Sequence, residues 1–236
     1  MKTVDDVLAE LKKRGTERTR KTYVRHGVPP GAYGVSMADL KAIAKRLKGN
    51  QALAVALYDT GIFEAMYLAG MVADGSLMSK PQLESWAKNA TCGLVSEYAV
   101  AGVAAQSPSA WELATKWIKS KQESIATTGW CTYAGVVATT SDEKLDLAEI
   151  RKLLDLVAAR IHTAPNLVRY TMNAFVIAVG TYVKPLLAEA KQAAKAIGAV
   201  SVDMGETACK VPLASTYIAK VEKAGRVGKK RLTVRA

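Results

Sequence analysis

The sequence has few of the residues from which metal sites and disulfide frameworks are built. Its 236 residues include only three cysteines and two histidines, and no two cysteines have the Cys-x-x-Cys spacing of a zinc or redox motif. Cys92, Cys131 and Cys209 are odd in number and widely spaced, which also argues against a disulfide framework. We therefore expect a protein that holds no metal and no other cofactor.

Long apolar segments are lacking as well. No run approaches the ~18 residues that a membrane span needs, and the residues after Met1 lack the hydrophobic core of a signal peptide. The sequence therefore predicts a cytoplasmic chain that does not contact a membrane.

Motifs of known catalytic sites are also lacking. The sequence contains no GxSxG elbow, Walker A loop, GxGxxG, HExxH or EF-hand loop. Because His26 and His162 are far apart, Ser–His or Cys–His catalysis has weak support. We interpret Glu97, Asp142 and Glu143 as exposed helix residues or caps. An enzyme built from this sequence would rely on carboxylates, aromatic residues and arginines, a set suited to a cationic transition state.

The residues that are abundant favour helices. Half of the chain is hydrophobic but only 6% is aromatic, and Ala, Leu and Lys enter helices at little cost. Helix boundary signals recur every ~15–22 residues, a spacing typical of helix–turn–helix repeats. We predict an all-α protein, an α-solenoid of antiparallel helix pairs over residues 1–236 as one domain. A compact bundle of unrelated helices is the alternative.

Several local signals place helix ends and loops. Ser36 is a predicted N-cap with Asp39 in the first turn, and Ser141-Asp142-Glu143 is expected to cap a later helix. Residues 200–212 are expected to form an extended stretch without regular structure.

Positive charge is in excess and is concentrated in two segments. The formal net charge is +12, which favours association with polyanions. Residues 12–25 contain seven basic residues against Glu17, and residues 220–236 contain seven against Glu222. Residues 226–236 are interpreted as a basic tail that could bind phosphates, the alternative being a solvated terminus.

Three later segments resemble a known family. They are Val168-Arg169-Tyr170-Thr171-Met172-Asn173-Ala174-Phe175-Val176-Ile177-Ala178-Val179-Gly180, Val202-Asp203-Met204-Gly205-Glu206-Thr207-Ala208-Cys209-Lys210-Val211-Pro212 and Gly228-Lys229-Lys230-Arg231. Together with Gly34-Val35 and Leu57-Tyr58-Asp59, they are similar to the DNA alkylation repair enzymes, from about residue 23 to the end.

This resemblance implies HEAT-like repeats that form a superhelix with a concave basic face. Active members of the family are DNA glycosylases that remove N3- or N7-alkylated purines. Their catalytic Asp stabilises the developing oxocarbenium sugar and lies in a stretch of the form Trp-Asp-x-Val-Asp.

The catalytic stretch is where this sequence departs from the family. Alignment on Val95 puts Cys92 at the Trp, Gly93 at the first Asp and Ser96 at the catalytic Asp. A Ser hydroxyl carries no negative charge, so it lacks the electrostatic stabilisation that one such group supplies, often ~3–4 kcal/mol. Glu97 is adjacent, but in an α-helix it points ~100° away.

We therefore expect a protein that binds duplex, branched or damaged DNA without excising a base, and that is a monomer. An active glycosylase that uses other residues and a helical scaffold for protein partners remain alternatives. Arg169 and Asn173 lie four residues apart on one helix face, where Arg169 could reach a phosphate or bridge to an acid on the next helix. Phe175 is expected in the core. The predicted DNA-binding residues are Arg18, Arg20, Lys21, Arg25, Arg169, Asn173, Lys210, Lys229, Lys230 and Arg231.

Overall fold

The computed structural model describes residues 3–234, and within that range it contains helices and no strand. The predicted all-α class is confirmed. The described residues form two compact units, unit 1 with residues 3–113 and 204–208 and unit 2 with residues 114–203 and 209–234. The assignment of residues 1–236 to one domain stays a prediction.

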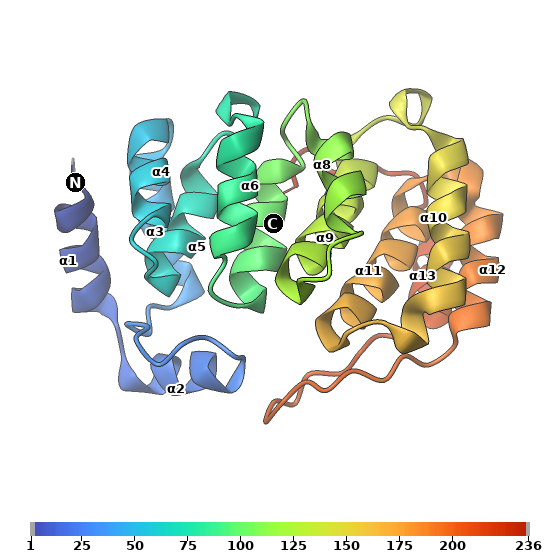
Figure 1. The fold of residues 1–236 in the computed structure, drawn as a ribbon. Coiled ribbons are helices and arrows are strands. Elements are labelled where there is room, and N and C mark those ends of the chain that lie inside the picture. Colours follow the sequence, from blue (N-terminus) through green and yellow to red (C-terminus); the bar gives the residue numbers. More distant parts are fainter. Residues whose placement is uncertain (1–2, 235–236) are drawn as a thin grey trace. The chain divides into compact units, whose positions relative to one another are not determined.

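Unit 1 consists of short helices that pack on their neighbours along the chain (Figure 1). Its helices are α1 (Val4–Arg14), α2 (Glu17–Arg25), α3 (Met37–Leu47), α4 (Gln51–Tyr58), α5 (Phe63–Val72), a 3-10 turn (Gly75–Leu77), α6 (Lys80–Asn89), a π-helix (Val95–Val100), α7 (Ala101–Ala104) and the start of α8 (Ala110–Trp117). The boundary between the two units falls inside α8.

Helix α5 is the centre of unit 1 and packs against α3, α4 and the π-helix. It is buried along almost its whole length, because its sequence is apolar on every side. Gly70 permits α5 to approach the π-helix closely, since a Cβ there would lie 2.5 Å from the Cα of Ala99. The rings of Tyr58 and Trp86, both buried, stack with their centroids 4.0 Å apart.

Unit 2 contains longer helices, with α11 at its centre against α9, α12 and α13 (Figure 1). Its helices are α9 (Glu123–Thr139), α10 (Leu147–Arg160), α11 (Asn166–Tyr182), α12 (Leu187–Ile197) and α13 (Ala214–Lys223), with 3-10 turns at Asp142–Lys144, Ile161–Thr163 and Lys184–Leu186. Phe175 of α11 is fully buried against Trp130 and Tyr133, so its predicted place in the core is confirmed.

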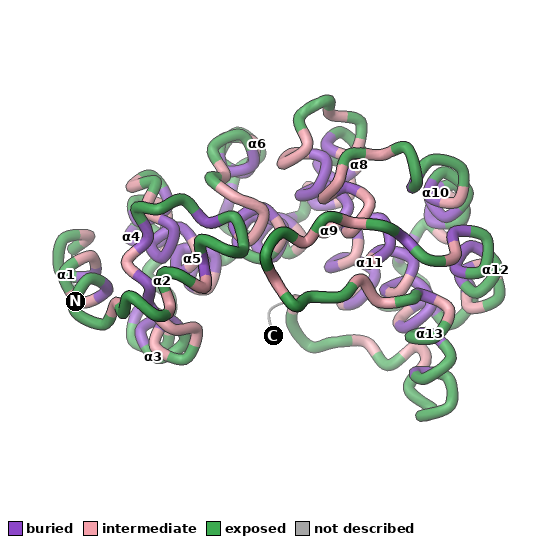
Figure 2. The backbone as a smooth tube through the Cα atoms, turned by 90° about the horizontal axis from the view of Figure 1, so that it is seen from below, coloured by how far each residue is buried: buried purple, intermediate pink, exposed green. Residues whose placement is uncertain are grey.

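Burial follows the helix faces within each unit: buried positions lie toward neighbouring helices and exposed positions toward solvent (Figure 2). Residues 200–212 contain no helix, as predicted. The predicted N-cap Ser36 is confirmed, because its hydroxyl oxygen accepts from the Asp39 amide at 3.1 Å.

The prediction that Ser141-Asp142-Glu143 caps a helix is wrong. These residues begin the short 3-10 turn, and α10 starts only at Leu147. The side chain of Asp146 caps α10 by accepting from the Glu149 amide at 2.9 Å. Asp and Ser have similar capping preferences, so composition alone does not tell which of the two residues caps the helix.

No single helix within residues 3–234 is long and apolar enough to cross a membrane. Helix α11 and the segment Lys184–Ile197 meet the requirement only together, as a pair bent by 115°.

Candidate nucleic-acid interface

Helix α2 presents the first predicted set of cations. Thr16 caps it by accepting from the Thr19 amide at 3.3 Å, and only Tyr23 among its residues is buried. All four predicted cations on this helix are exposed to solvent: Arg18, Arg20, Lys21 and Arg25. One of them is paired with an acid, since Arg20 Nη2 lies 2.6 Å from Glu17 Oε2. Helix α2 is therefore a largely unneutralised basic surface.

Three contacts to neighbouring segments fix α2 in unit 1. The Tyr23 hydroxyl donates to the Val35 carbonyl at 2.6 Å, and the Tyr23 ring meets that of Phe63 edge-on. The Thr16 amide donates to the Gly34 carbonyl at 2.9 Å. Gly34 has a φ of +83°, and a Cβ there would lie 2.3 Å from the Thr16 carbonyl oxygen. Only glycine fits this approach of the loop to the start of α2.

A buried carboxylate holds the loop that follows α2. Glu64 on α5 is 0% exposed, and it accepts hydrogen bonds from the backbone amides of Tyr33 at 3.0 Å, Gly34 at 2.6 Å and Val35 at 3.3 Å. A charged group is stable in the core only with such partners. Glu64 thus ties the core of unit 1 to the segment that positions the basic helix.

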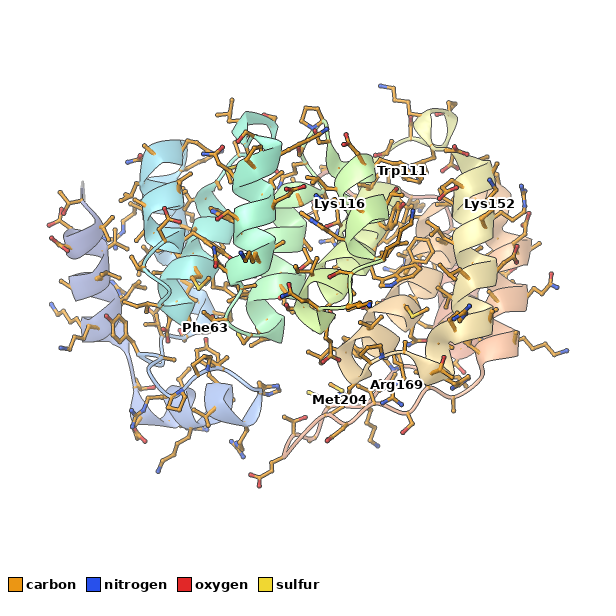
Figure 3. All side chains as sticks on the ribbon, in the orientation of Figure 1. Phe63, Trp111, Lys116, Lys152, Arg169 and Met204 are labelled. Carbon is orange, nitrogen blue, oxygen red and sulfur yellow. The ribbon has the colours of Figure 1, made fainter. Side chains whose placement is uncertain are left out.

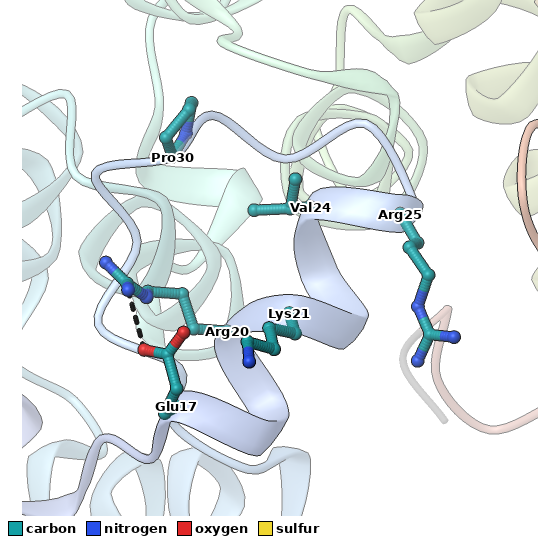
Figure 4. A pocket seen from close by; sticks show the side chains of 6 residues that line it. All are labelled: Glu17, Arg20, Lys21, Val24, Arg25 and Pro30. Carbon is teal, nitrogen blue, oxygen red and sulfur yellow. Dashed lines mark ion pairs between the residues drawn. The ribbon is translucent and has the colours of Figure 1, made fainter.

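A cavity of about 580 Å³ lies between α2 and this loop (Figure 4). The residues that line it are Glu17, Arg20, Lys21, Val24, Arg25 and Pro30. Three of these side chains are cationic, and all six belong to unit 1. The sequence did not predict this cavity, because Pro30 reaches it only through the path of the loop.

On α11, the predicted residue Asn173 holds a loop instead of facing solvent, together with Asn166 at the start of the helix. Asn173 is 1% exposed, and its amide donates to the Pro212 carbonyl at 2.9 Å. Asn166 both donates to the carbonyl and accepts from the amide of Asp203, each at 2.8 Å. Asn166 and Asn173 thereby fasten the two ends of the segment that carries Lys210, so the assignment of Asn173 to a DNA surface is wrong.

Arg169 lies between these two asparagines, near the start of α11 (Figure 3). It is half-buried, and its Nη2 donates to Asn166 Oδ1 at 3.3 Å. Its Nε is buried and has no hydrogen-bond partner within residues 3–234. The alternative that Arg169 bridges to an acid on the next helix is not seen within that range. Lys210 on the loop is exposed.

The C-terminal segment packs onto unit 2 along part of its length. Lys230 Nζ lies 2.7 Å from Asp142 Oδ1 and donates to the Val137 carbonyl at 2.9 Å, and both ion-paired side chains are about one-fifth exposed, 19% and 21%. Asp142 is therefore not the exposed residue that the sequence indicated. Lys229 and Arg231 remain exposed. Arg235, the last cation of the predicted tail, lies outside the described residues.

The stretch that departs from the catalytic motif leads into the π-helix. Cys92 and Gly93 precede it, both half-buried, and Ser96 lies within it, 0% exposed. The Ser96 hydroxyl has no hydrogen-bond partner within residues 3–234. At this position the chain therefore offers a buried neutral hydroxyl and no carboxylate.

Glu97 was expected to be exposed, and that expectation is wrong. It is half-buried in the π-helix, and this burial raises the pKa of its carboxyl to about 7. Tyr67 is close enough for Glu97 to contribute to the rise of the Tyr67 pKa to about 12, after burial as the main cause. One feature of the sequence could have indicated this burial: Glu97 is the only charged residue between Lys88 and Glu112. π-Turns inside helices are frequent at functional sites.

Comparison with known proteins gives matches of three kinds. Residues 6–197 match the family described as DNA alkylation repair enzyme. Uncharacterized proteins of Listeria innocua and of Listeria monocytogenes are each 32% identical over 226 residues, which cover 93% of this chain and 97% of each relative. A solved structure with 35% identity matches with a TM-score of 0.90 and covers 99% of this chain and 100% of its own.

That solved structure is described as a new family of proteins related to the HEAT-like repeat DNA glycosylases, with affinity for branched DNA structures. The predicted HEAT-like helical fold is thereby confirmed. The concave basic face expected from the family stays a prediction.

Proposed function

This chain belongs to the DNA alkylation repair enzyme family, and we propose that it binds branched DNA through α2 and does not excise a base. The exposed cations Lys210, Lys229 and Arg231 belong to unit 2, and we propose them as a separate set of phosphate contacts. The concave basic face, the monomeric state and the cytoplasmic location predicted from the sequence belong to the same proposal.

The observation that carries the proposal is the charge on α2. Arg18, Lys21 and Arg25 are exposed and form no ion pair within residues 3–234. A phosphate bound to such a cation releases condensed counterions, which drives binding to DNA. The relative with 35% identity, described as having affinity for branched DNA, supports the same kind of partner.

Ser96 supports binding without excision. The glycosylases of this family need a carboxylate beside the sugar, and a buried neutral hydroxyl cannot balance the charge of an oxocarbenium ion.

The proposal is tested by the binding of a four-way junction and of a linear duplex with the same sequence and length. Fluorescence anisotropy over a series of salt concentrations gives both the affinity and its salt dependence. We expect the junction to bind at least about tenfold more tightly, a difference of ~1.4 kcal/mol. Equal affinity for the two DNAs would contradict a preference for branches, and an affinity independent of salt would contradict phosphate binding.

Glu97 favours a second candidate function, base excision that uses this carboxyl in place of the one lost at position 96. The carboxyl is half-buried in the π-helix directly after Ser96. A cationic alkylated base or sugar beside it would favour the ionised form and lower its pKa.

Release of 3-methyladenine and 7-methylguanine from methylated duplex DNA separates the two candidates. Excision by Glu97 predicts release that increases with pH up to about 7 and that Glu97→Gln abolishes. Binding without excision predicts release at background in both proteins.

A further inference from the structure

The cavity beside α2 combines an apolar floor with a cationic rim. Val24 is a large hydrophobic side chain that remains 44% exposed, and Pro30 of the loop also lines the cavity (Figure 4). The aliphatic stems of Arg20 and Lys21 extend this apolar surface while their charged ends stay in water. Its volume of about 580 Å³ lies within the range of small-ligand sites, roughly 300–1,000 Å³.

The cations on the rim of the cavity differ in whether they have an ion-pair partner. Arg20 is paired with Glu17 at 2.6 Å, which fixes its planar guanidinium at the wall of the cavity. Lys21 and Arg25 have no side-chain partner within residues 3–234, so they are available to an anion. A fixed guanidinium plane can stack on a nucleobase, and free cations bind phosphate.

We propose that this cavity takes one unpaired nucleotide of the bound DNA. Its base lies on Val24 and Pro30 against the Arg20 guanidinium, and its phosphate binds Lys21 and Arg25. This inference rests on the proposed function and deepens it, because it assigns the preference for branched DNA to unpaired nucleotides at the branch.

The chemistry of the cavity favours a nucleotide over other anionic partners. A phosphate of a paired strand would bind the cations of the rim, but it would leave the apolar floor of the cavity exposed to water. An acidic peptide would complement the rim, but it offers no flat apolar face for Val24 and Pro30. An unpaired base is flat, apolar on both faces and attached to a phosphate, so it matches floor and rim together.

The experiment compares a fully paired four-way junction with the same junction carrying two extra unpaired thymines at the branch. Stacking of one base contributes roughly 1–3 kcal/mol, which corresponds to roughly 5- to 150-fold in affinity. We expect the intact protein to bind the junction with thymines about tenfold more tightly. A third junction carries two abasic residues in place of the thymines, so that it keeps the phosphates and lacks the bases.

Val24→Gln is the test variant, because it removes the apolar floor without any change of charge. Val24 is exposed on α2, and glutamine is a good helix former, so the variant is expected to fold. It should lose the preference for unpaired thymines and keep its affinity for the fully paired junction. Leu77→Gln is the matched control, since Leu77 is another exposed apolar residue of unit 1 (66%) outside the cavity. The Leu77→Gln variant should keep the preference for the junction with unpaired thymines.

The remaining outcomes would contradict either the inference alone or the inference together with the proposed function. If the intact protein binds the paired junction and the junction with thymines equally, the inference is wrong and the proposed function stands. If abasic residues bind as tightly as thymines, or if Val24→Gln keeps the preference, the cavity does not hold a base and the inference is again wrong. If no junction binds at any salt concentration, both the inference and the proposed function are wrong.

Discussion

Replacement of Glu97 by glutamine should remove a large pH dependence from the stability of unit 1. In the folded chain, burial raises the carboxyl pKa from 4.5 to about 7. The folded state therefore binds more protons than the unfolded state between these two values. The stability from this group is complete below pH 4.5, decreases as the pH rises, and is lost above about pH 7.

The size of this effect follows from the same two values. One pKa unit corresponds to about 1.4 kcal/mol, so the rise from 4.5 to about 7 corresponds to at most about 3 kcal/mol between pH 4.5 and pH 8. A glutamine side chain at this position cannot ionise and would not show this loss. The variant should therefore be more stable than the parent protein at pH 8.

Urea unfolding followed by circular dichroism at pH 5 and pH 8 measures the difference. The parent protein should lose about 2–3 kcal/mol more than Glu97→Gln over this interval. Glu206→Gln serves as the control, because Glu206 is exposed, and it should behave as the parent protein does. The same loss in the parent protein and in Glu97→Gln would refute the argument that Glu97 is desolvated.

Three further predictions concern the contacts that fix the site. Glu64→Ala leaves three backbone amides without an acceptor, so urea unfolding should show a loss of about 3 kcal/mol or more; a loss below about 1 kcal/mol would contradict the role of Glu64. Lys230→Ala leaves the carboxylate of Asp142 without its ion-pair partner, and a loss of roughly 1–3 kcal/mol is expected, whereas Lys229→Ala should change the stability by less than about 0.5 kcal/mol. Asn173→Ala removes the hydrogen bond to Pro212 and should speed amide hydrogen exchange in residues 209–213; unchanged exchange would show that Asn173 does not hold the loop.

Local sequence signals were enough to predict much of the fold. The cap at Ser36 and the burial of Phe175 depend on neighbours within the same helix, and the structure confirms both. The exposure of the cations on α2 could likewise be predicted from the sequence, because only one face of a short polar helix can be buried. These features require no knowledge of which distant segment packs where.

The errors concern residues whose surroundings come from distant segments. Asn173 was placed on a surface because it shares a helix face with Arg169, but the loop that ends at Pro212 covers it. Asp142 was taken as a cap, but the C-terminal segment brings Lys230 to it. Glu97 was judged from α-helical geometry, and the chain forms a π-helix at that point.

The central claim, that α2 holds the DNA, is tested most directly by two variants that each lose three positive charges. One carries R18Q, K21Q and R25Q on α2. The other carries K41Q, K45Q and K48Q on and just after α3, where Lys41, Lys45 and Lys48 are all exposed.

The measurement is the slope of the logarithm of junction affinity against the logarithm of salt concentration. Each lost phosphate contact should reduce the magnitude of the slope by about 1. The α2 variant should therefore show a slope smaller by about 2–3 and a much weaker affinity, and the α3 variant should stay within about 1 of the parent protein. Equal slopes in the two variants would contradict the account, because binding would then depend on total charge and not on α2.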